Sequence, residues 1–310
     1  MDVLRLTLRQ LQIFVAVARK GTTTAASTEI SLSQSATSSA VNELERLLSL
    51  RLFDRSGKRL LLNDNGRTLL PRALALLDGA SSIERMSRDG SAQAQSLRIG
   101  ASTTIGNYVL PKLLGQFLLE SPQPKASGWR SKVTIGNTEA ICAAVAEFEL
   151  DVGLIEGPCH QSALSVTAWL QDELVVVTGR RDQTAPNTGF DYGDGKVPIK
   201  ALREMMWLLR EPGSGTRDTT DQLLLPHLRS YQRSIELGSS EAIKSAVAEG
   251  LGVACLSNWV VGDWVESGRL RRLQTTVPKM TRQCYWVVHR DKQLTPALRT
   301  FIAQATRNQV

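Results

Sequence analysis

Short polar side chains gather in the segment from Ser33 to Asn42. If Ser33 is the N-cap of a helix, the apolar residues Ala36, Ala40 and Val41 begin one face, at steps of three and four. The opposite face then carries small uncharged side chains that both donate and accept hydrogen bonds, which suits contact with base edges in a DNA major groove. The candidate DNA-binding residues are Ser33, Gln34, Ser35, Thr37, Ser38 and Asn42. An ordinary helical hairpin in a protein core is the alternative interpretation.

Three turns combine hydroxyl or amide side chains with glycine, each at a place where a strand gives way to a helix. Free backbone amides and a positive helix terminus favour anions there, and glycine lets the backbone approach a ligand closely. The candidate ligand-binding residues are Ser102, Thr103 and Thr104; Asn137, Thr138 and Glu139; and Gly213, Ser214, Gly215, Thr216 and Arg217. Each turn alone is more typical of a capped helix start, so the prediction of a small-anion site rests on the three turns together.

Catalytic motifs are missing from the sequence. It contains no GxSxG, GxxxxGK[ST], HExxH or strand-following GxGxxG pattern, and its three histidines are scattered. The four cysteines, Cys142, Cys159, Cys255 and Cys284, have no CxxC pairing and are expected to be reduced thiols. We therefore expect a non-enzyme with no catalytic residues, no cofactor and no metal site.

The N-terminal elements would position the candidate DNA-binding residues. Thr7 to Lys20 has a helical apolar pattern that stops at Gly21. After the Ser33 helix, the apolar runs Leu52–Phe53 and Leu60–Leu62 flank a basic glycine-containing turn, which predicts a short β-hairpin. At the tip of this hairpin, the candidate phosphate or minor-groove contacts are Arg55, Lys58 and Arg59. A solvated charged turn is the alternative.

A long helix is expected to start at Asn63 or Asp64 and to run to about Asp89. Its apolar residues repeat at steps of three and four over a face wider than one domain core needs, so the helix should pair with a second copy of itself. Pro71 should bend it or loosen its first turns. The polar stretch from Ser87 to Ser96 is the best linker in the sequence.

From Leu97 onward, short apolar strands alternate with amphipathic helices, as in parallel α/β units. The expected strands are 97–101, 133–135, 152–155, 174–178, 207–209, 234–237, 253–256 and 284–289. The expected helices are 109–119, 138–148, 216–228, 240–249 and 295–306.

Length and composition agree with a soluble protein of two or more domains. The chain has 310 residues, with 42% hydrophobic and 22% charged side chains. Its net charge is +7, and residues 1–92 hold 13 Lys and Arg against 9 Asp and Glu, so the N-terminal part is the more basic per residue. No apolar run of membrane-spanning length and no signal-peptide core is visible, so we expect a cytoplasmic protein.

Residues 1 to about 90 resemble the winged helix-turn-helix of LysR-type transcriptional regulators. The resemblance is carried by LRQLQIFVAVARKGTTTAAS and SLSQSATSSAVNELERLLSLRLFDRSGKRLLLNDNG, with Ser35 where many members have proline. It implies a homodimer through the long helix, often assembled into a homotetramer, that binds double-stranded promoter DNA. RNA polymerase is a candidate further partner. For the C-terminal part it implies two similar subdomains around an effector-binding cleft, as in periplasmic binding proteins.

The fold class expected is α/β with an N-terminal α-helical winged helix-turn-helix domain and a C-terminal two-lobed effector domain. The expected DNA-binding domain is 1–63, followed by a dimerisation helix at 64–90 and a hinge at 91–96. The effector domain is expected at 97–310, with lobe I at about 97–168 and 267–310 and lobe II at about 169–266.

Two further segments, GASTTIGNYVLP and ELGSSEAIKSAVAEGLGVACLS, are similar to the branch of that family that governs sulfur assimilation, sulfite handling and carbon fixation. We therefore expect a regulator whose operator binding or assembly is switched by a small anionic effector, with a sulfur oxyanion as one candidate. A carboxylate or a phosphorylated metabolite is the alternative effector. A nucleoid-associated protein that binds any DNA, or a solute-binding protein, is the alternative class.

Overall fold

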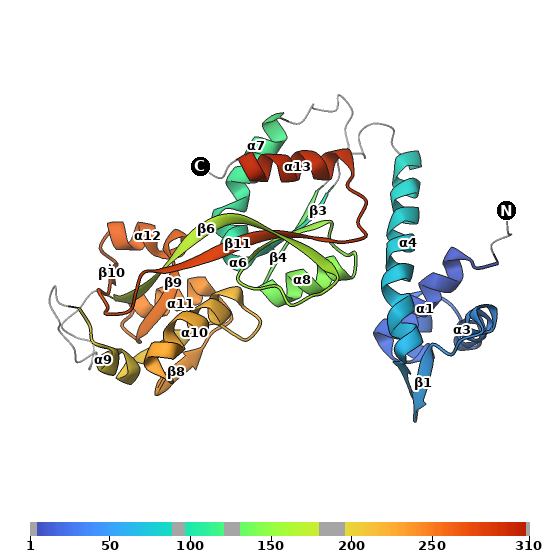
Figure 1. Cartoon of the computed structure of the whole chain (residues 1–310), viewed down its shortest axis with the longest axis horizontal. Helices are drawn as coiled ribbons and strands as arrows, with labels where there is room; N and C mark the ends of the chain where they lie inside the picture. The colour runs from blue at the N-terminus through green and yellow to red at the C-terminus, as the bar shows by residue number, and fades with distance from the viewer. Residues whose placement is uncertain (1–4, 89–96, 121–130, 180–195, 308–310) are drawn as a thin grey trace. The chain divides into compact units, whose positions relative to one another are not determined.

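The structure, a computed structural model, describes residues 5–88, 97–120, 131–179 and 196–307. The chain divides into two compact units, one of residues 1–93 with 291–293 and the other of residues 94–290 with 294–310 (Figure 1). The hinge expected at 91–96 lies outside the described residues.

The N-terminal unit is a helical domain with a small hairpin. Its elements are α1 (Leu8–Lys20), α2 (Thr23–Glu29), α3 (Gln34–Leu48), β1 (Phe53–Ser56), β2 (Arg59–Leu62) and α4 (Asp64–Arg88). Thr7 and Gln10 form a capping box at the start of α1, and Gly21 ends the helix in the left-handed conformation at φ 69°. Phe14 is fully buried and its ring centroid lies 5.5 Å from that of Phe53, so α1 packs against strand β1.

Helix α3 begins at the predicted cap and buries Val41 as predicted, but its first buried residue is Thr37 and not Ala36. The Ser33 hydroxyl accepts a hydrogen bond from the Ala36 amide at 3.1 Å. The buried residues are Thr37, Val41, Leu44 and Glu45. Ala36, which we expected on the buried face, is exposed. Steps of four and three from Thr37 lead to Val41 and Leu44, on a stripe that Ala36 does not share.

The hairpin β1–β2 is antiparallel, with Phe53 opposite Leu62 and Ser56 opposite Arg59. Its strands are longer than the apolar runs suggested, so the basic segment predicted as a turn is mostly strand. Gly57, at φ 60°, makes the tight turn.

Helix α4 is a single helix that contains Pro71 near its start. The Asn63 side chain accepts a hydrogen bond from the Gly66 amide at 3.0 Å and so caps it. One side of α4 buries Ala73 and Leu74, whereas Leu76 and Ile83 are 55% and 69% exposed.

The C-terminal unit is built on one continuous mixed sheet. Its elements are β3 (Arg98–Ser102), α6 (Thr103–Tyr108), α7 (Leu110–Glu120), β4 (Lys132–Gly136), α8 (Thr138–Ala146), β5 (Val152–Glu156), β6 (Leu164–Gly179), α9 (Ile199–Glu204), β7 (Met206–Leu209), α10 (Gly215–Leu228), β8 (Arg233–Glu236), α11 (Ser240–Ala248), β9 (Val253–Ser257), α12 (Asn258–Glu266), β10 (Leu270–Arg272), β11 (Met280–His289) and α13 (Pro296–Arg307). Among the described residues the strand order is β4-β3-β5-β11-β6-β9-β7-β8, and β10 pairs with β6. The outer strand pairs are parallel, whereas β6 and β11 form an antiparallel pair along the middle of the unit (Figure 1).

Strands β6 and β11 join two lobes, each with its own core. Lobe I buries Ile99, Phe117 and Phe301, and lobe II buries Trp207, Leu224 and Ile243. The first half of β6 belongs to lobe I and the second half to lobe II, so the chain crosses near Leu170, close to the expected Trp169.

The return crossing lies later than the expected position near Ser267. Leu270 packs in the lobe II core and pairs with Gly179, and Met280 also lies in that core. Cys284 is the first residue of β11 in the lobe I core. The prediction at Ser267 was wrong because a short edge strand, β10, returns along β6 before β11 crosses between the lobes.

Several short elements were not predicted. A helix was expected from Val109, but α6 already begins at Thr103 and ends where α7 starts. Helix α9 and strand β10 were also missed, because each is too short to show a clear period. Helix α12 was missed as well, although it is as long as α8 and α11.

Candidate functional site

The N-terminal unit contains a groove of about 410 Å³ between α3 and the β1–β2 hairpin. Six of the nine candidate DNA-binding residues line it: Gln34, Ser38, Asn42, Arg55, Lys58 and Arg59. The hairpin register puts Arg55 on β1 and Arg59 on β2, with Lys58 in the turn between them. The groove therefore joins uncharged polar side chains of a helix to cations of a hairpin.

The first turn of α3 is held in place by its own side chains. The Gln34 amide donates a hydrogen bond to the Thr23 hydroxyl at 3.1 Å, which links α3 to α2. The hydroxyls of Ser33 and Ser35 lie 3.0 Å apart, and both residues are exposed. This turn thus presents polar groups from a fixed backbone.

Thr37 does not belong to the exposed set. Its side chain is fully buried, and its hydroxyl donates a hydrogen bond to the Ser33 carbonyl at 3.0 Å. The prediction that Thr37 contacts DNA was therefore wrong, because the residue lies on the stripe that faces the domain core.

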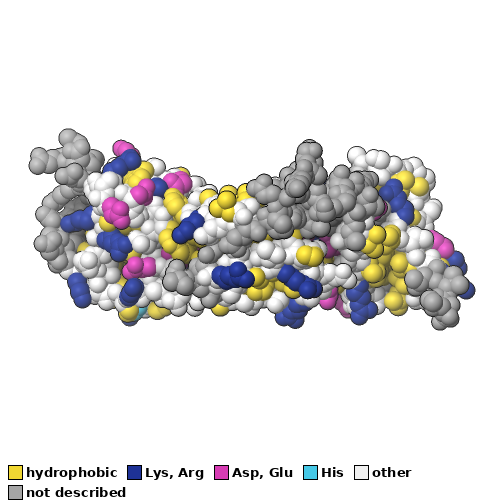
Figure 2. Space-filling model, turned by 90° about the horizontal axis from the view of Figure 1, so that it is seen from above, with side chains coloured by type: hydrophobic (Ala, Val, Ile, Leu, Met, Phe, Trp, Pro, Cys, Tyr) yellow, Lys and Arg dark blue, Asp and Glu magenta, His cyan; other side chains and the backbone are white. Residues whose placement is uncertain are grey.

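On the face of the molecule seen in Figure 2, charge alone does not mark a single binding region. In the space-filling view of Figure 2, Lys and Arg side chains are spread among hydrophobic and other side chains on the visible face. The assignment of a DNA interface therefore depends on the local groove between α3 and the hairpin.

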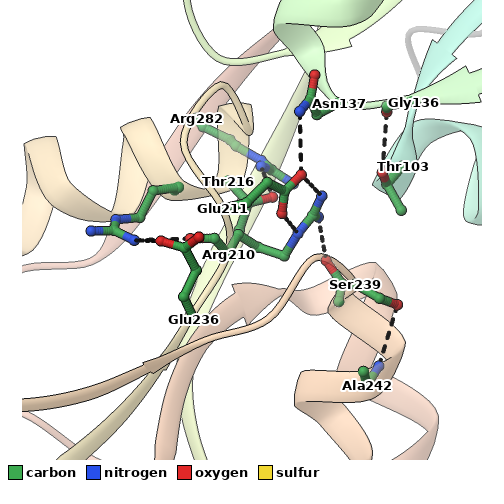
Figure 3. A network of polar contacts seen from close by, with 12 residues as sticks. Thr103, Gly136, Asn137, Arg210, Glu211, Thr216, Glu236, Ser239, Ala242 and Arg282 are labelled. Atoms are coloured by element: carbon green, nitrogen blue, oxygen red, sulfur yellow. Dashed lines mark hydrogen bonds and ion pairs between the residues drawn. The ribbon is translucent and has the colours of Figure 1, made fainter.

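In the C-terminal unit, the three glycine- and hydroxyl-containing turns come together between the lobes (Figure 3). The Thr103 hydroxyl donates to the Gly136 carbonyl at 3.1 Å, joining the first turn to the second. The Glu139 amide donates to the Gly213 carbonyl at 3.0 Å, joining the second to the third. We call the region enclosed by these three turns the interlobe cleft.

Several candidate ligand-binding side chains are already used inside the protein. The Ser102 hydroxyl accepts from the Glu156 amide at 3.3 Å, and the Thr138 hydroxyl donates to the Glu156 carbonyl at 2.8 Å. Ser102, Thr104, Thr138, Ser214 and Thr216 are all buried. Because they are buried, these five side chains are corrected from candidate ligand contacts to parts of the protein interior.

Gly215 and Arg217 also have structural partners. A Cβ atom on Gly215 would lie 1.7 Å from the Glu156 carbonyl oxygen, so only glycine fits this contact between the lobes. The Arg217 guanidinium lies 2.7 Å from Asp221 and donates to the Arg210 carbonyl at 2.9 Å. Its charge is therefore largely balanced within α10.

Besides Arg217, which is half-buried, four candidates remain at least partly accessible in the cleft. Thr103, Asn137 and Gly213 are half-buried and Glu139 is exposed. Asn137 caps α8 through its side-chain oxygen, which accepts from the Ala140 amide at 2.9 Å. Its side-chain nitrogen points across the cleft and donates to Glu211 at 3.4 Å (Figure 3).

Arg210 is the main candidate ligand-binding residue that was not predicted from the sequence. Only 3% exposed, it follows strand β7 and donates two hydrogen bonds to the Glu211 carboxylate, at 2.7 and 2.8 Å, and one to the Ser240 hydroxyl at 2.9 Å. The only available signal was a cation directly after the apolar run Trp207–Leu209. The guanidinium lies beside the first turn of α11, where a helix terminus favours anions.

A buried ionic cluster lies where β5, β6 and β11 meet. Arg282 lies 2.7 Å from Asp172 and donates to the Thr216 hydroxyl at 2.9 Å, while the Asp172 carboxylate also accepts from Ser257. Burial raises the pKa of Glu156 and of Asp172, and the Arg282 charge only partly opposes this rise. The cluster was not predicted because its members are far apart in sequence.

A second contact between the lobes involves Tyr108 and α11. The Tyr108 hydroxyl donates a hydrogen bond to Glu241, and the buried Lys244 ammonium lies 3.2 Å from the same hydroxyl. The Lys244 nitrogen also lies 4.7 Å from the Trp264 ring centroid, a cation–π distance. Burial, followed by the Glu241 contact, raises the pKa of Tyr108.

Residues 5–88, 97–120, 131–179 and 196–307 contain no group of three or more His, Cys, Asp or Glu side chains placed to hold a metal ion. None of the helices described is both long and apolar enough to cross a membrane. The four cysteines are free.

Comparison with known proteins agrees with both units. A family model described as the LysR substrate binding domain matches residues 90–309. A second, described as the bacterial regulatory helix-turn-helix protein of the lysR family, matches residues 8–67.

Individual relatives cover nearly the whole chain. The uncharacterized HTH-type transcriptional regulator YeiE of Escherichia coli is 43% identical over 299 residues, covering 96% of this chain and 97% of that protein. The RuBisCO operon transcriptional regulator of Allochromatium vinosum is 30% identical and covers 96% of this chain and 95% of that protein.

A solved structure resembles the C-terminal unit. The CcmR regulatory domain of Synechocystis PCC6803, in complex with 2-PG, is 29% identical with a TM-score of 0.57, covering 69% of this chain and 97% of that one. Together with the matched family models, these similarities show that this chain belongs to the LysR family, as a DNA-binding transcriptional regulator with an effector-binding domain and not an enzyme.

Proposed function

We propose that a small anionic effector binds in the interlobe cleft and switches operator binding or assembly of this regulator. The observation that carries the proposal is the Arg210 guanidinium, which is buried beside the first turn of α11 and faces Asn137 across the cleft. This guanidinium already binds one carboxylate, that of Glu211, so the position beside it is chemically suited to an oxyanion.

The proposed effector contacts are Arg210, Thr103, Asn137 and the backbone of the turn at Gly213. Thr103 offers a hydroxyl and Asn137 an amide group from lobe I, while Arg210 and Gly213 belong to lobe II. An anion that contacts groups of both lobes would hold the two lobes at one fixed distance.

The effector class stays open between two kinds of anion. A sulfur oxyanion such as sulfite or sulfate suits a cleft lined by hydroxyl, amide and guanidinium donors. A phosphorylated or carboxylated metabolite is the second candidate. It is favoured by the similarity to a RuBisCO operon regulator and to a regulatory domain solved with 2-PG.

For DNA, we propose that α3 enters the major groove and that the β1–β2 hairpin contacts the backbone or the minor-groove edge. The proposed contacts are Ser33, Gln34, Ser35, Ser38 and Asn42 from α3, with Arg55, Lys58 and Arg59 from the hairpin. The side chains of α3 would supply base discrimination, and the cations would supply affinity that depends on salt.

For assembly, we propose a homodimer through α4 and a homotetramer of two such dimers. Leu69, Leu76 and Ile83 repeat every seven residues on α4, and the last two are among its exposed apolar side chains. RNA polymerase is a further proposed partner. Sequence-independent nucleoid binding has less support, because the family consists of transcriptional regulators.

The proposed roles of the two units also define domain limits along the chain. We propose a DNA-binding domain at 1–63, a dimerisation helix at 64–90, a hinge at 91–96 and an effector domain from 97. The crossings favour lobe I at about 97–169 and 284–310, with lobe II between them.

Thr103→Ala tests the effector site without touching the DNA interface. Because an effector shifts an equilibrium only through different affinities for the two states, loss of one cleft contact should reduce the response while leaving DNA affinity unchanged. The experiment is a gel-shift titration of operator DNA, selected from a random pool by the wild-type protein, with and without sulfite, sulfate, phosphate or 2-PG. An undiminished response of the variant to an anion that acts on the wild-type protein would move the effector site elsewhere.

A further inference from the structure

The interlobe cleft already contains an anion, which is the protein's own Glu211 carboxylate. One carboxylate oxygen accepts from Arg210 Nε at 2.7 Å, and the other accepts from Arg210 Nη2 at 2.8 Å. The second oxygen also accepts from Asn137 Nδ2 at 3.4 Å, across the cleft (Figure 3). Glu211 therefore occupies the position that a bound oxyanion would need.

The cavity beside the Arg210 guanidinium is too small for a second anion. A cavity beside the guanidinium, lined in part by Thr216, Thr220 and Cys255, has a volume of about 10 Å³. This is the space of about one water molecule. An oxyanion can reach Arg210 only after the carboxylate has moved away.

Glu211 is placed so that it can move. Its side chain is 24% exposed, whereas that of Arg210 is 2% exposed. The next residues are Pro212, which is exposed, and Gly213, which is in the left-handed conformation at φ 80°. Burial alone would raise the pKa of Glu211, but the Arg210 and Asn137 hydrogen bonds outweigh it and lower the pKa, so the side chain is charged at neutral pH.

We propose that Glu211 is an internal competitor of the effector, which must displace this carboxylate from Arg210 in order to bind. The proposal rests on the proposed function and adds its regulation and ligand class. A monocarboxylate offers no more charge than the group it replaces, and Glu211 has the advantage of being tethered. The effector should therefore be a doubly charged oxyanion, such as a sulfate-like ion or a phosphate ester.

Displacement also changes the contact between the lobes. When the Glu211 carboxylate occupies the site, it links Arg210 of lobe II to Asn137 of lobe I. Once an oxyanion takes its place, the same two donors bind a ligand that is not tethered to either lobe. The interlobe link then depends on effector concentration.

The test uses Glu211→Gln in the full-length protein, with inorganic sulfate and phosphate as probes at constant ionic strength. The apparent affinity for the probe is the intrinsic affinity multiplied by the fraction of molecules whose site is open. If Glu211 fills about nine sites in ten, removing it should lower the half-saturating probe concentration about tenfold. Thermal unfolding against probe concentration gives this value. Acetate, a monoanion, should shift the midpoint of the wild-type protein no more than chloride does.

Glu236→Gln is the matched control, because it removes the same charge 3.8 Å from Arg217 and makes no contact with Arg210 that the structure records. Its sulfate response should equal that of the wild-type protein. The double variant Arg210→Gln with Glu211→Gln should lose the gained response, since both members of the pair are then neutral.

An unchanged sulfate and phosphate response of Glu211→Gln would overturn the proposal. So would a gained response that persists in the double variant, or a Glu211→Gln protein that stays unfolded whether or not sulfate is present. A Glu211→Gln protein that is unfolded in chloride and folds when sulfate is added would support the proposal. Glu211→Ala should behave in the same way. If Glu211→Gln gains nothing while Thr103→Ala still abolishes an effector response, the competitor is excluded and the effector site remains.

Discussion

The DNA-binding groove and the interlobe cleft use similar polar side chains in opposite ways. Around the groove, Gln34, Ser35 and Asn42 are exposed on a helix with a fixed cap. In the cleft, the hydroxyls of Thr138 and Thr216 are buried and bonded to the protein itself. The groove can therefore accept DNA by adding contacts, whereas the cleft must exchange existing contacts for those of a ligand. That difference makes the cleft the better suited of the two to sensing a ligand.

The largest effect is expected from Arg282→Met, which removes the cation of the buried cluster. Glu156 and Asp172 would then lie buried without it, at a cost of about 3–5 kcal/mol in the free energy of unfolding. The pKa values of both carboxyls are raised in the folded state, so their contribution to stability is present at low pH and is lost as pH rises through those raised values.

Thermal unfolding of the Arg282→Met variant checks this. The stability that the variant loses relative to the wild-type protein should be greatest near neutral pH and should become smaller as the solution becomes more acidic. The exposed Arg233→Met, on strand β8, is the control and should change stability by about 0.5 kcal/mol or less. A similar deficit at every pH would show that the cluster does not act through charge.

Gly215→Ala should have the next largest effect, because the added Cβ would lie 1.7 Å from the Glu156 carbonyl oxygen. The nearest atom belongs to the backbone and cannot turn aside as the end of a flexible side chain can. We therefore expect a loss of about 3 kcal/mol in the free energy of unfolding. Gly115→Ala is the matched control within helix α7, where a Cβ meets nothing within 4 Å. That variant should gain up to about 1 kcal/mol. Equal unfolding midpoints for the two variants would contradict the close contact of the lobes at Gly215.

The sequence predicted the N-terminal unit better than the cleft, for a physical reason. Thr7, Gly21 and Ser33 act on backbone groups within a few residues, so their types alone set the helix ends. Arg210 and Asn137 acquire their roles only when two lobes fold around strands β6 and β11, and no local period reports that. Thr37 marks the limit within α3, since a shift of one residue decides which face is buried.

On the DNA side, Gln34→Ala should weaken specific binding by about 1–3 kcal/mol if this side chain contacts a base edge. The dimer should remain intact, because α4 is unaffected. A gel-shift titration with selected operator DNA, together with size-exclusion chromatography, measures both. Unchanged operator affinity would count against α3 as the base-reading element.

Lys58→Ala should have the smallest effect. Lys58 lies at the exposed hairpin turn, and loss of one phosphate contact should weaken binding to all sequences alike and reduce the slope of log affinity against log salt by about 1. A loss confined to the operator sequence would instead mean that the hairpin reads bases.

The most direct test of the central claim is the thermal unfolding of the full-length protein against sulfate, sulfite, phosphate, 2-PG and acetate. Binding to the folded state raises its stability by about 2.7 kcal/mol at a hundredfold excess over the dissociation constant. We predict that at least one doubly charged oxyanion raises the midpoint, that acetate does not, and that Thr103→Ala diminishes the shift. No shift with any of these dianions, or one that Thr103→Ala leaves unchanged, would contradict an anion site in the interlobe cleft.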